Sequence, residues 1–184
     1  KGFVANYAAA VERSRSIVTK LTNGVSSLLQ KNQVAVIEGN ATIVDRQSVL
    51  VNGDIVTANN IIIATGARPR SLPGLEIDGK LVVSHREAIV STSLPKRPVI
   101  IGGGAIGVEF ASIYNSYGSE VTIVEFESSI MPREDREITK QLSNALTRQG
   151  ISILTDSRVT EVKPTGTGGS VLIDTPSGSQ SLEA

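Results

Sequence analysis

The chain has 184 residues, and its 18 basic and 18 acidic side chains leave a formal net charge of zero, which gives no indication of nucleic-acid or anionic-membrane binding. It contains no cysteine, which excludes disulfide bonds, thiolate metal sites and cysteine catalysis within the chain, and we expect no metal site. Hydrophobic residues make up 40% of the sequence, enough for a core, whereas aromatic residues make up 3% and leave little for base stacking.

Residues 4–30 are predicted to form one long helix. Valines recur every seven positions, and three of the four companion positions carry Tyr7, Leu21 and Leu28. This spacing predicts a helix with one apolar stripe. The stripe either packs against the helix's own domain or also contributes to a subunit interface, and both alternatives stay open.

Short segments of β-type sequence follow the helix. Residues 33–39 and 61–64 are apolar runs typical of strands in a parallel sheet. Between them, a small antiparallel meander is predicted from residues 42–44, 48–51 and 54–57, with Asn52-Gly53 as a hairpin turn. We also expect a short strand at residues 81–83 and a short helix capped by Ser84, with His85 as a surface residue beside the cap.

Three consecutive glycines, Gly102 to Gly104, follow the apolar run Val99-Ile100-Ile101 directly, and Gly107 completes the glycine segment Gly102–Gly107. An Ala-rich stretch with helical spacing continues to about Tyr117, and Gly118 is typical of a residue that ends a helix. A strand, a glycine turn and a helix in this order predict a dinucleotide-binding βαβ unit. Its glycines allow a tight turn, a close approach of pyrophosphate to the backbone, and close packing of the helix on the sheet.

A second strand is predicted over residues 120–125, and it ends in the carboxylate of Glu125. Glu125 lies 23 positions after Gly102, close to the roughly 20 residues expected for an acid that binds ribose. A carboxylate accepts hydrogen bonds from a ribose 2′-hydroxyl but repels a 2′-phosphate, and none of the next four residues is Arg or Lys. The pattern therefore favours NAD over NADP, and the alternative is a solvated acid at a strand end.

The rest of the chain continues the same alternation. A helix is predicted from about Asp135 to Gln149, closed by Gly150, and residues 151–154 are typical of a third parallel strand. Residues 158–162 and 170–173 predict a hairpin across a Gly-rich turn at 166–169.

These motifs and their order resemble the middle of the pyridine nucleotide–disulfide oxidoreductase family. The matching positions are residues 61–69, 99–109, 118–119, 124–125 and 131–132, together with Asp135. The resemblance implies an α/β fold of two Rossmann-like nucleotide-binding domains, both incomplete. Residues 1–95 would be a partial FAD-binding domain with the β-meander inserted in it. Residues 96–184 would be a C-terminally truncated NAD-binding domain.

The resemblance also implies two sets of cofactor-binding residues. Thr65, Gly66 and Ala67 would lie beside the diphosphate of FAD, and the backbone at Gly39 and Ala41 would lie at its adenosine end. NAD would be bound by Glu125, by Val159 near the adenine, by Glu109 near the nicotinamide, and by the turn and first helical residues, which are Gly102, Gly103, Gly104, Ala105, Ile106, Gly107 and Val108.

Within the family, the motifs are most similar to those of members that oxidise dihydrolipoamide with NAD, through FAD and a redox disulfide. That likeness implies dihydrolipoamide on a lipoyl carrier domain as partner, a homodimer and a cytoplasmic location. The chain lacks the family's Cys-x4-Cys pair, its first FAD glycine motif, its late Gly-Asp motif and its C-terminal His–Glu pair. We therefore expect an internal piece of a longer enzyme, with no catalytic residue and no activity by itself. The alternatives are a non-catalytic NAD-binding module, or a relative such as mercuric reductase, soluble transhydrogenase or NADH oxidase.

Overall fold

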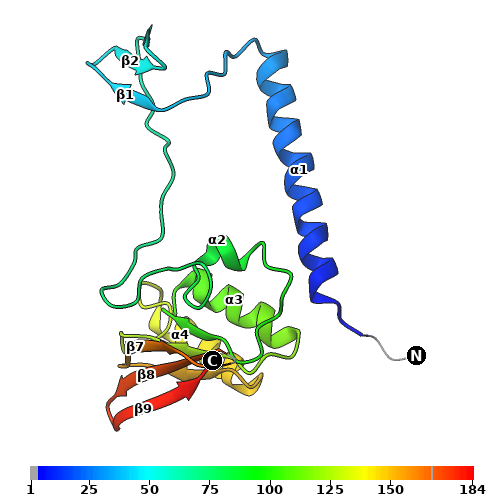
Figure 1. Ribbon diagram of the computed structural model, residues 1–184, viewed down its shortest axis with the longest axis vertical. Coiled ribbons are helices and arrows are strands. Elements are labelled where there is room, and N and C mark those ends of the chain that lie inside the picture. Colours follow the sequence, from blue (N-terminus) through cyan, green and yellow to red (C-terminus); the bar gives the residue numbers. More distant parts are fainter. Residues whose placement is uncertain (1–3, 167) are drawn as a thin grey trace. The chain divides into compact units, whose positions relative to one another are not determined.

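The computed structural model describes residues 4–166 and 168–184, which contain both helices and strands (Figure 1). The chain divides into two compact units. The meander unit consists of Ser14–Arg68, and the glycine-turn unit combines the residues up to Arg13 with Pro69–Ala184. The segment that precedes the expected boundary at residue 95 therefore packs with the glycine-turn unit. The division into domains of residues 1–95 and 96–184 stays a prediction.

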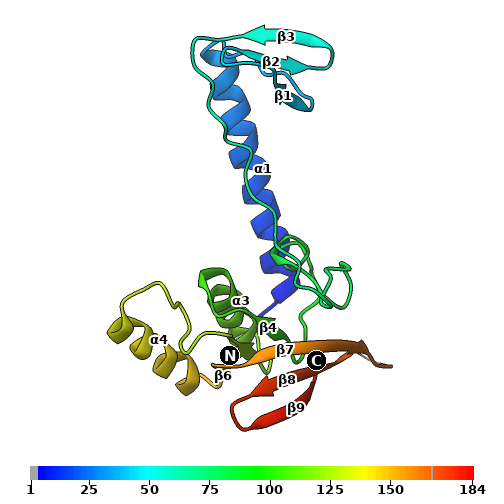
Figure 2. The same cartoon turned by 90° about the vertical axis from the view of Figure 1, so that its left-hand side faces the viewer.

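The meander unit contains the expected antiparallel sheet of β1 (Ala41–Ile43), β2 (Ser48–Val51) and β3 (Asp54–Thr57), in that order (Figure 2). The hairpin between β2 and β3 turns at Asn52 and Gly53, whose φ angles are 53° and 94°. Two successive positive φ angles are typical of the tight turn that matches the twist of paired strands. The predicted meander and its turn are confirmed.

The strands expected at residues 33–39 and 61–64 are not formed, and this prediction was wrong. Both segments are irregular, and Ile62 and Ile63 are 89% and 70% exposed. A parallel strand is stable only when neighbours on the sheet take up its N–H and C=O groups. Among the described residues no other strand pairs with either segment. The expected Rossmann-like arrangement of residues 1–95 is therefore not seen in the structure.

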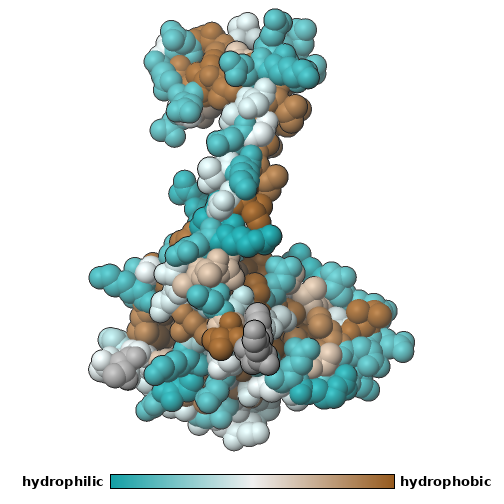
Figure 3. Space-filling view, turned by 90° about the vertical axis from the view of Figure 1, so that its right-hand side faces the viewer, coloured by the Kyte–Doolittle hydropathy of each residue, from teal (hydrophilic) through white to brown (hydrophobic). Residues whose placement is uncertain are grey.

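Helix α1 (Tyr7–Lys31) confirms the predicted long helix. The Asn6 side chain accepts a hydrogen bond from the Ala9 N–H at 3.0 Å and so caps its first turn. Tyr7 and Val11 are buried, whereas later members of the apolar stripe such as Leu21 and Leu28 are 66% and 60% exposed. Figure 3 shows hydrophobic side chains gathered along one side of the helix. The start of the stripe packs on the chain's own core, and a subunit interface for the remainder stays a prediction.

A parallel sheet forms the centre of the glycine-turn unit. It consists of β4 (Val99–Ile101), β5 (Thr122–Val124) and β6 (Ser152–Leu154), with β5 in the middle. Helix α3 (Ala105–Ser116) connects β4 to β5, and α4 (Arg136–Arg148) connects β5 to β6. Asp135 caps α4 by accepting hydrogen bonds from the backbone N–H groups of Glu137 and Ile138. The predicted strand–helix alternation is confirmed here.

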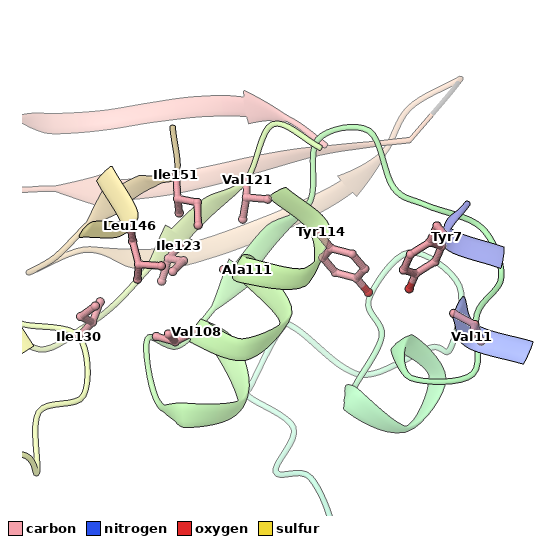
Figure 4. Close-up of a cluster of buried hydrophobic side chains, with 10 residues drawn as sticks. All are labelled: Tyr7, Val11, Val108, Ala111, Tyr114, Val121, Ile123, Ile130, Leu146 and Ile151. Atoms are coloured by element: carbon pink, nitrogen blue, oxygen red, sulfur yellow. The ribbon is translucent and has the colours of Figure 1, made fainter. Parts of the chain in front are cut away.

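The two faces of this sheet are both covered, because successive side chains of a strand point to opposite faces. Ile123 of β5 packs with Ala111 of α3 and Leu146 of α4 in one cluster of buried residues (Figure 4). The next residue, Val124, packs in a second cluster with Val159 and Ile173 of the following sheet. The unit is therefore built in three layers: helices, parallel sheet and antiparallel sheet.

The antiparallel layer consists of β7 (Arg158–Pro164), β8 (Gly169–Thr175) and β9 (Gly178–Glu183). The hairpin of β7 and β8 was predicted, although residue 167 of the expected turn lies outside the described residues. Strand β9 was not predicted. It pairs with β8 along its whole length, from Thr175↔Gly178 to Ser170↔Glu183.

Residues 69–95 pack on the same unit without the expected strand at 81–83. Asp78 prevents a strand there, because its Oδ1 accepts hydrogen bonds from the N–H groups of Lys80, Leu81 and Val82 at 2.8–2.9 Å. A side chain that takes up successive backbone donors competes with a sheet. The expected short helix is present as α2 (His85–Ala88), with Ser84 and Glu87 forming a reciprocal cap and His85 exposed. In the part of the chain that the structure describes, no helix is long and apolar enough to cross a membrane.

Three tyrosines join the first turn of α1 to the end of α3. Tyr7 lies 6.1 Å from Tyr114 and 5.3 Å from Tyr117, measured between ring centroids. Burial, together with the neighbouring Tyr7, raises the pKa of Tyr114 to about 12 from its ordinary value of 10.0. Folding therefore favours the neutral hydroxyl of Tyr114 over the ionised phenolate.

We expect the free energy of unfolding to fall as the pH rises from 10 towards 12. The pKa of Tyr114 is higher in the folded chain than in the unfolded chain, so its contribution is complete below pH 10 and is lost as the pH rises through the folded value. A shift of this size corresponds to up to about 3 kcal/mol. Urea unfolding followed by far-UV circular dichroism at several pH values measures it. Tyr114→Phe should flatten the decline, and Tyr117→Phe serves as the matched control; an equal decline in the Tyr114→Phe variant would contradict the assignment.

Candidate dinucleotide-binding site

The glycine turn begins where β4 ends. Gly102 has a φ of 104°, which favours glycine, and its N–H donates a hydrogen bond of 2.8 Å to the carbonyl of Val124 on β5. A Cβ on Gly107 would collide with the carbonyl oxygen of Gly102, and it would also lie 3.2 Å from the Ile100 side chain. The absence of a side chain at Gly107 therefore allows α3 to start directly against the turn.

The N-terminus of α3 is open. Gly104 is its N-cap residue, no side chain caps it, and the first turn carries no acidic residue. The position of a Cβ on Gly104 has no atom within 4 Å, so the backbone there can be approached closely. Unpaired N–H groups and the positive end of a helix dipole favour an anion at such a place. The backbone at the start of α3 is therefore open to an anion, and phosphate binding by the turn stays a prediction.

Glu125 lies directly after β5 and is buried, with 8% of the residue exposed. Its Oε2 accepts a hydrogen bond of 2.6 Å from the N–H of Gly103, and its Oε1 accepts one of 2.8 Å from the N–H of Glu127. The carboxylate therefore joins the end of β5 to the turn after β4. The structure corrects the alternative of a solvated acid, because both oxygens have backbone partners.

Gly103 is held from a second direction. Its carbonyl accepts a hydrogen bond of 2.8 Å from the N–H of Met131, which has a φ of 49°. A Cβ on Gly103 would lie 2.8 Å from the side chain of Ile130, which is 1% exposed. Sequence reasoning did not assign these contacts of Glu127, Ile130 and Met131. Their signal in the sequence is weak, because they depend on a loop that returns to the turn.

The other residues expected around NAD are placed as follows. Val108 on α3 is buried in the core and anchors the helix, while Glu109 is exposed. Ala105 and Ile106 form the first turn of α3, and Ile106 is 54% exposed. Val159 is 5% exposed and packs in the second core cluster, so its side chain faces the protein interior.

The residues expected around FAD lie in the meander unit. Gly39 is close to the side chain of Asn52, which donates a hydrogen bond of 2.8 Å to the carbonyl of Glu38, and Ala41 begins β1. Thr65, Gly66 and Ala67 lie in an irregular, exposed segment. The strands expected at residues 33–39 and 61–64, which would bring residues 39–41 and 65–67 to one ligand, are not formed. The described residues therefore do not form an FAD-binding site by themselves.

One contact at the site joins residues far apart in the sequence. The guanidinium carbon of Arg158 lies 5.9 Å from the ring centroid of Phe126, the residue after Glu125. Sequence reasoning considered basic residues near Glu125 only along the chain and therefore missed Arg158. The fold brings them together because the strand ends at residues 125–127 and 154–157 share three backbone hydrogen bonds of 2.8–3.0 Å.

These features define an α/β protein whose candidate ligand site lies at the carboxyl ends of parallel strands, where open sheets of this class bind nucleotides. The family described as pyridine nucleotide-disulphide oxidoreductase matches residues 1–183. The chain belongs to this family, and the resemblance inferred from the motifs is confirmed.

Individual relatives agree with this assignment. The chain is 42% identical over 163 residues to a dihydrolipoyl dehydrogenase of Zymomonas mobilis, covering 86% of this chain and 35% of that protein. It is 37% identical over 172 residues to a dihydrolipoyl dehydrogenase of Bacillus subtilis, covering 86% and 36%. It thus spans little more than a third of the length of these relatives.

Solved structures show the same fold. The HOCl-induced flavoprotein disulfide reductase RclA from Escherichia coli, in a Cu(II) complex, is 28% identical with a TM-score of 0.79, covering 98% of this chain and 41% of that one. LpdA from Mycobacterium tuberculosis is 23% identical with a TM-score of 0.83, covering 98% and 41%, and supports the fold alone.

Replacing Gly107 by alanine should destabilise the glycine-turn unit by about 1–3 kcal/mol, because the new methyl group would force α3 away from the Gly102 carbonyl. Gly104→Ala is the matched control. Its φ of −73° suits alanine and its surroundings are open, so the expected cost is only the weaker N-cap preference of alanine, about 0.5–1 kcal/mol. Urea unfolding of both variants measures the difference, and equal midpoints would contradict the close approach at Gly107.

Proposed function

We propose that the glycine turn binds NAD, and that this chain is the NAD-binding central part of a flavoprotein that oxidises dihydrolipoamide to lipoamide. The observation that carries the proposal is the Glu125 carboxylate, fixed at the edge of the turn by the N–H groups of Gly103 and Glu127. An acceptor that is already held in place loses little freedom when a ligand binds.

The hydrogen-bonding capacity of Glu125 leaves room for a ribose. An ionised carboxylate offers about four acceptor sites, and the two backbone N–H groups use one on each oxygen. The remaining sites would take the 2′- and 3′-hydroxyls of an adenosine ribose. A 2′-phosphate at the same place would be repelled by the carboxylate, which supports NAD rather than NADP as the nucleotide.

The open N-terminus of α3 would hold the pyrophosphate of the same molecule. Its backbone donors and dipole favour negative charge, and the free space at Gly104 admits a phosphate close to the main chain. By the family resemblance, the exposed Glu109 would lie towards the nicotinamide. The role of this chain is therefore to bind NAD and to orient its nicotinamide.

The oxidation of dihydrolipoamide is proposed for the longer protein. When bound there, FAD would supply the two-electron relay between a dithiol and NAD. The similarity to relatives named dihydrolipoyl dehydrogenase supports this substrate over those of mercuric reductase, soluble transhydrogenase or NADH oxidase. A lipoyl carrier domain as partner and a homodimer belong to the same proposal.

For the chain as it stands, the absence of cysteine favours a binding role without turnover. Thiol–disulfide exchange requires a thiolate, and none is present in this sequence. We expect the chain to bind NADH in a calorimetric titration and to show no reduction of NAD when dihydrolipoamide and FAD are added. Measurable turnover above a sample without protein would contradict this expectation.

Glu125→Ala should narrow the preference for NADH over NADPH. The variant loses a charged acceptor for the ribose hydroxyls, worth on the order of 1.5–3 kcal/mol, and also loses the repulsion of a 2′-phosphate. Titrations of the unmodified chain and the variant with both nucleotides measure the ratio of the two dissociation constants.

The ratio is the informative quantity, because Glu125 also holds the turn and its removal lowers the fraction of folded protein. That loss affects both nucleotides equally within one variant and cancels in the ratio. Glu127→Ala, which keeps the backbone N–H that Glu125 accepts, is the matched control and should retain the preference. Equal binding of NADH and NADPH by the unmodified chain would refute the role of Glu125.

A further inference from the structure

The side chain of Asn52 joins the β2–β3 hairpin turn to the segment that precedes β1. Asn52 takes the first positive φ angle of the turn, 53°, and Gly53 takes the second, 94°. Its Nδ2 donates a hydrogen bond of 2.8 Å to the backbone carbonyl of Glu38, which lies 14 positions earlier in the chain. The position of Glu38 relative to the turn therefore depends on the amide nitrogen of one side chain.

The backbone of Gly39 lies directly against the same amide. A Cβ on Gly39 would collide with Oδ1 of Asn52 and would lie 2.8 Å from Nδ2 and 2.9 Å from Cγ. A residue without a side chain at position 39 therefore leaves the room that the amide occupies. Asn52 and Gly39 are both exposed, so water reaches this contact.

An asparagine that is followed by glycine carries an intrinsic reactivity, because no Cβ on the glycine hinders the approach of its nitrogen to the preceding side chain. The nitrogen of Gly53 forms a bond to Cγ of Asn52, the Cγ–Nδ2 bond breaks, and the Gly53 proton leaves with Nδ2 as ammonia. Water then opens the resulting succinimide ring at either of its carbonyls, which gives aspartate or isoaspartate. The net reaction consumes water, releases ammonia, and requires no oxidant or reductant.

We propose that Asn52 is a site of spontaneous deamidation, and that the reaction releases Glu38 from the hairpin turn. In the product, an oxygen that only accepts hydrogen bonds replaces the Nδ2 donor, so it faces the Glu38 carbonyl without a proton between them. The new carboxylate also adds a negative charge. The inference concerns the meander unit and is independent of the proposed NAD site.

A second asparagine–glycine pair, Asn23-Gly24, provides a comparison within the same chain. It lies inside α1, where the N–H of an interior residue donates to the carbonyl four residues earlier. The nitrogen of Gly24 can therefore attack only after a local opening of the helix. At Asn52 the side chain has to leave the Glu38 carbonyl, which is one hydrogen bond at an exposed place. Both asparagines are exposed, so access of water does not distinguish them.

The test follows both sites in the full chain by peptide mass spectrometry after incubation at neutral and at mildly alkaline pH. Deamidation appears as a gain of about 1 Da in the peptide that contains the asparagine. The gain at Asn52 should be about tenfold faster than at Asn23, because a helical hydrogen bond must open before Gly24 reacts. It should also accelerate with pH, since the attacking nitrogen must lose its proton. In urea the two rates should converge.

No mass gain at Asn52, or equal rates at the two asparagines in the folded chain, would overturn the proposal. Asn52→Asp and Asn23→Asp are the matched variants. The first should abolish the fast mass gain, and the second should leave it unchanged.

Gly39→Ala should raise the rate at Asn52 relative to Asn23 in the same sample, because the new methyl group displaces the amide from the Glu38 carbonyl. The internal reference matters, since unfolding of the whole chain would bring the two rates together instead. A ratio equal to or below that of the unmodified chain would contradict the protective role of the contact.

The release of Glu38 is tested by amide hydrogen exchange over residues 34–40. Exchange there should be faster in Asn52→Asp than in Asn23→Asp, because only the first variant loses the hydrogen bond to Glu38. Equal exchange in the two variants would show that the segment keeps its place without the Asn52 amide, and would overturn this part of the proposal.

Discussion

The hydrogen bond from the Gly103 N–H to the buried carboxylate of Glu125 is the contact on which the candidate nucleotide site depends. It joins the turn after β4 to the end of β5, and the second oxygen of the same carboxylate holds the N–H of Glu127. The carbonyl of Gly103 accepts a further hydrogen bond from the N–H of Met131. A glycine turn is intrinsically flexible, so these bonds decide whether its N–H groups face a ligand as a fixed set.

This contact exists because the strands are parallel. Residues of β4 and β5 run in register from Val99↔Thr122 to Ile101↔Val124, so the turn and Glu125 emerge at the same edge of the sheet. The alternation along β5 then secures the edge from both faces, since Ile123 and Val124 belong to different clusters of buried side chains. Side chains packed on both faces of the sheet therefore hold β5 in place, and β5 in turn positions Glu125 at the candidate site.

The sequence predicted the glycine-turn unit well, because its signals are local. The apolar run before Gly102, the helix closed by Gly118 and the acid at Glu125 each depend on residues close in the chain. Strand β9 was missed because its residues, Gly178–Glu183, are mostly polar, and it forms only by pairing with β8. The approach of Arg158 to Phe126 could not be predicted, because it arises from pairing between segments 125–127 and 154–157.

The opposite error occurred in the meander unit. The segment Ile61-Ile62-Ile63 has the composition of a buried strand, but composition gives only a tendency to form a strand. A strand also needs neighbouring strands whose N–H and C=O groups pair with its backbone. The meander itself was predicted correctly, because an Asn-Gly turn brings its own partner strand within a few residues. Local pairing can be inferred from a sequence, whereas pairing with a distant segment requires the rest of the sheet.

The tyrosine cluster has an optical consequence. The chain contains three tyrosines and no tryptophan, and all three tyrosines lie where the first turn of α1 meets the end of α3. The tyrosine emission of this chain therefore originates at this one junction. The intensity and polarisation of this emission report whether the start of the long helix remains packed on the rest of the glycine-turn unit, without any label being introduced.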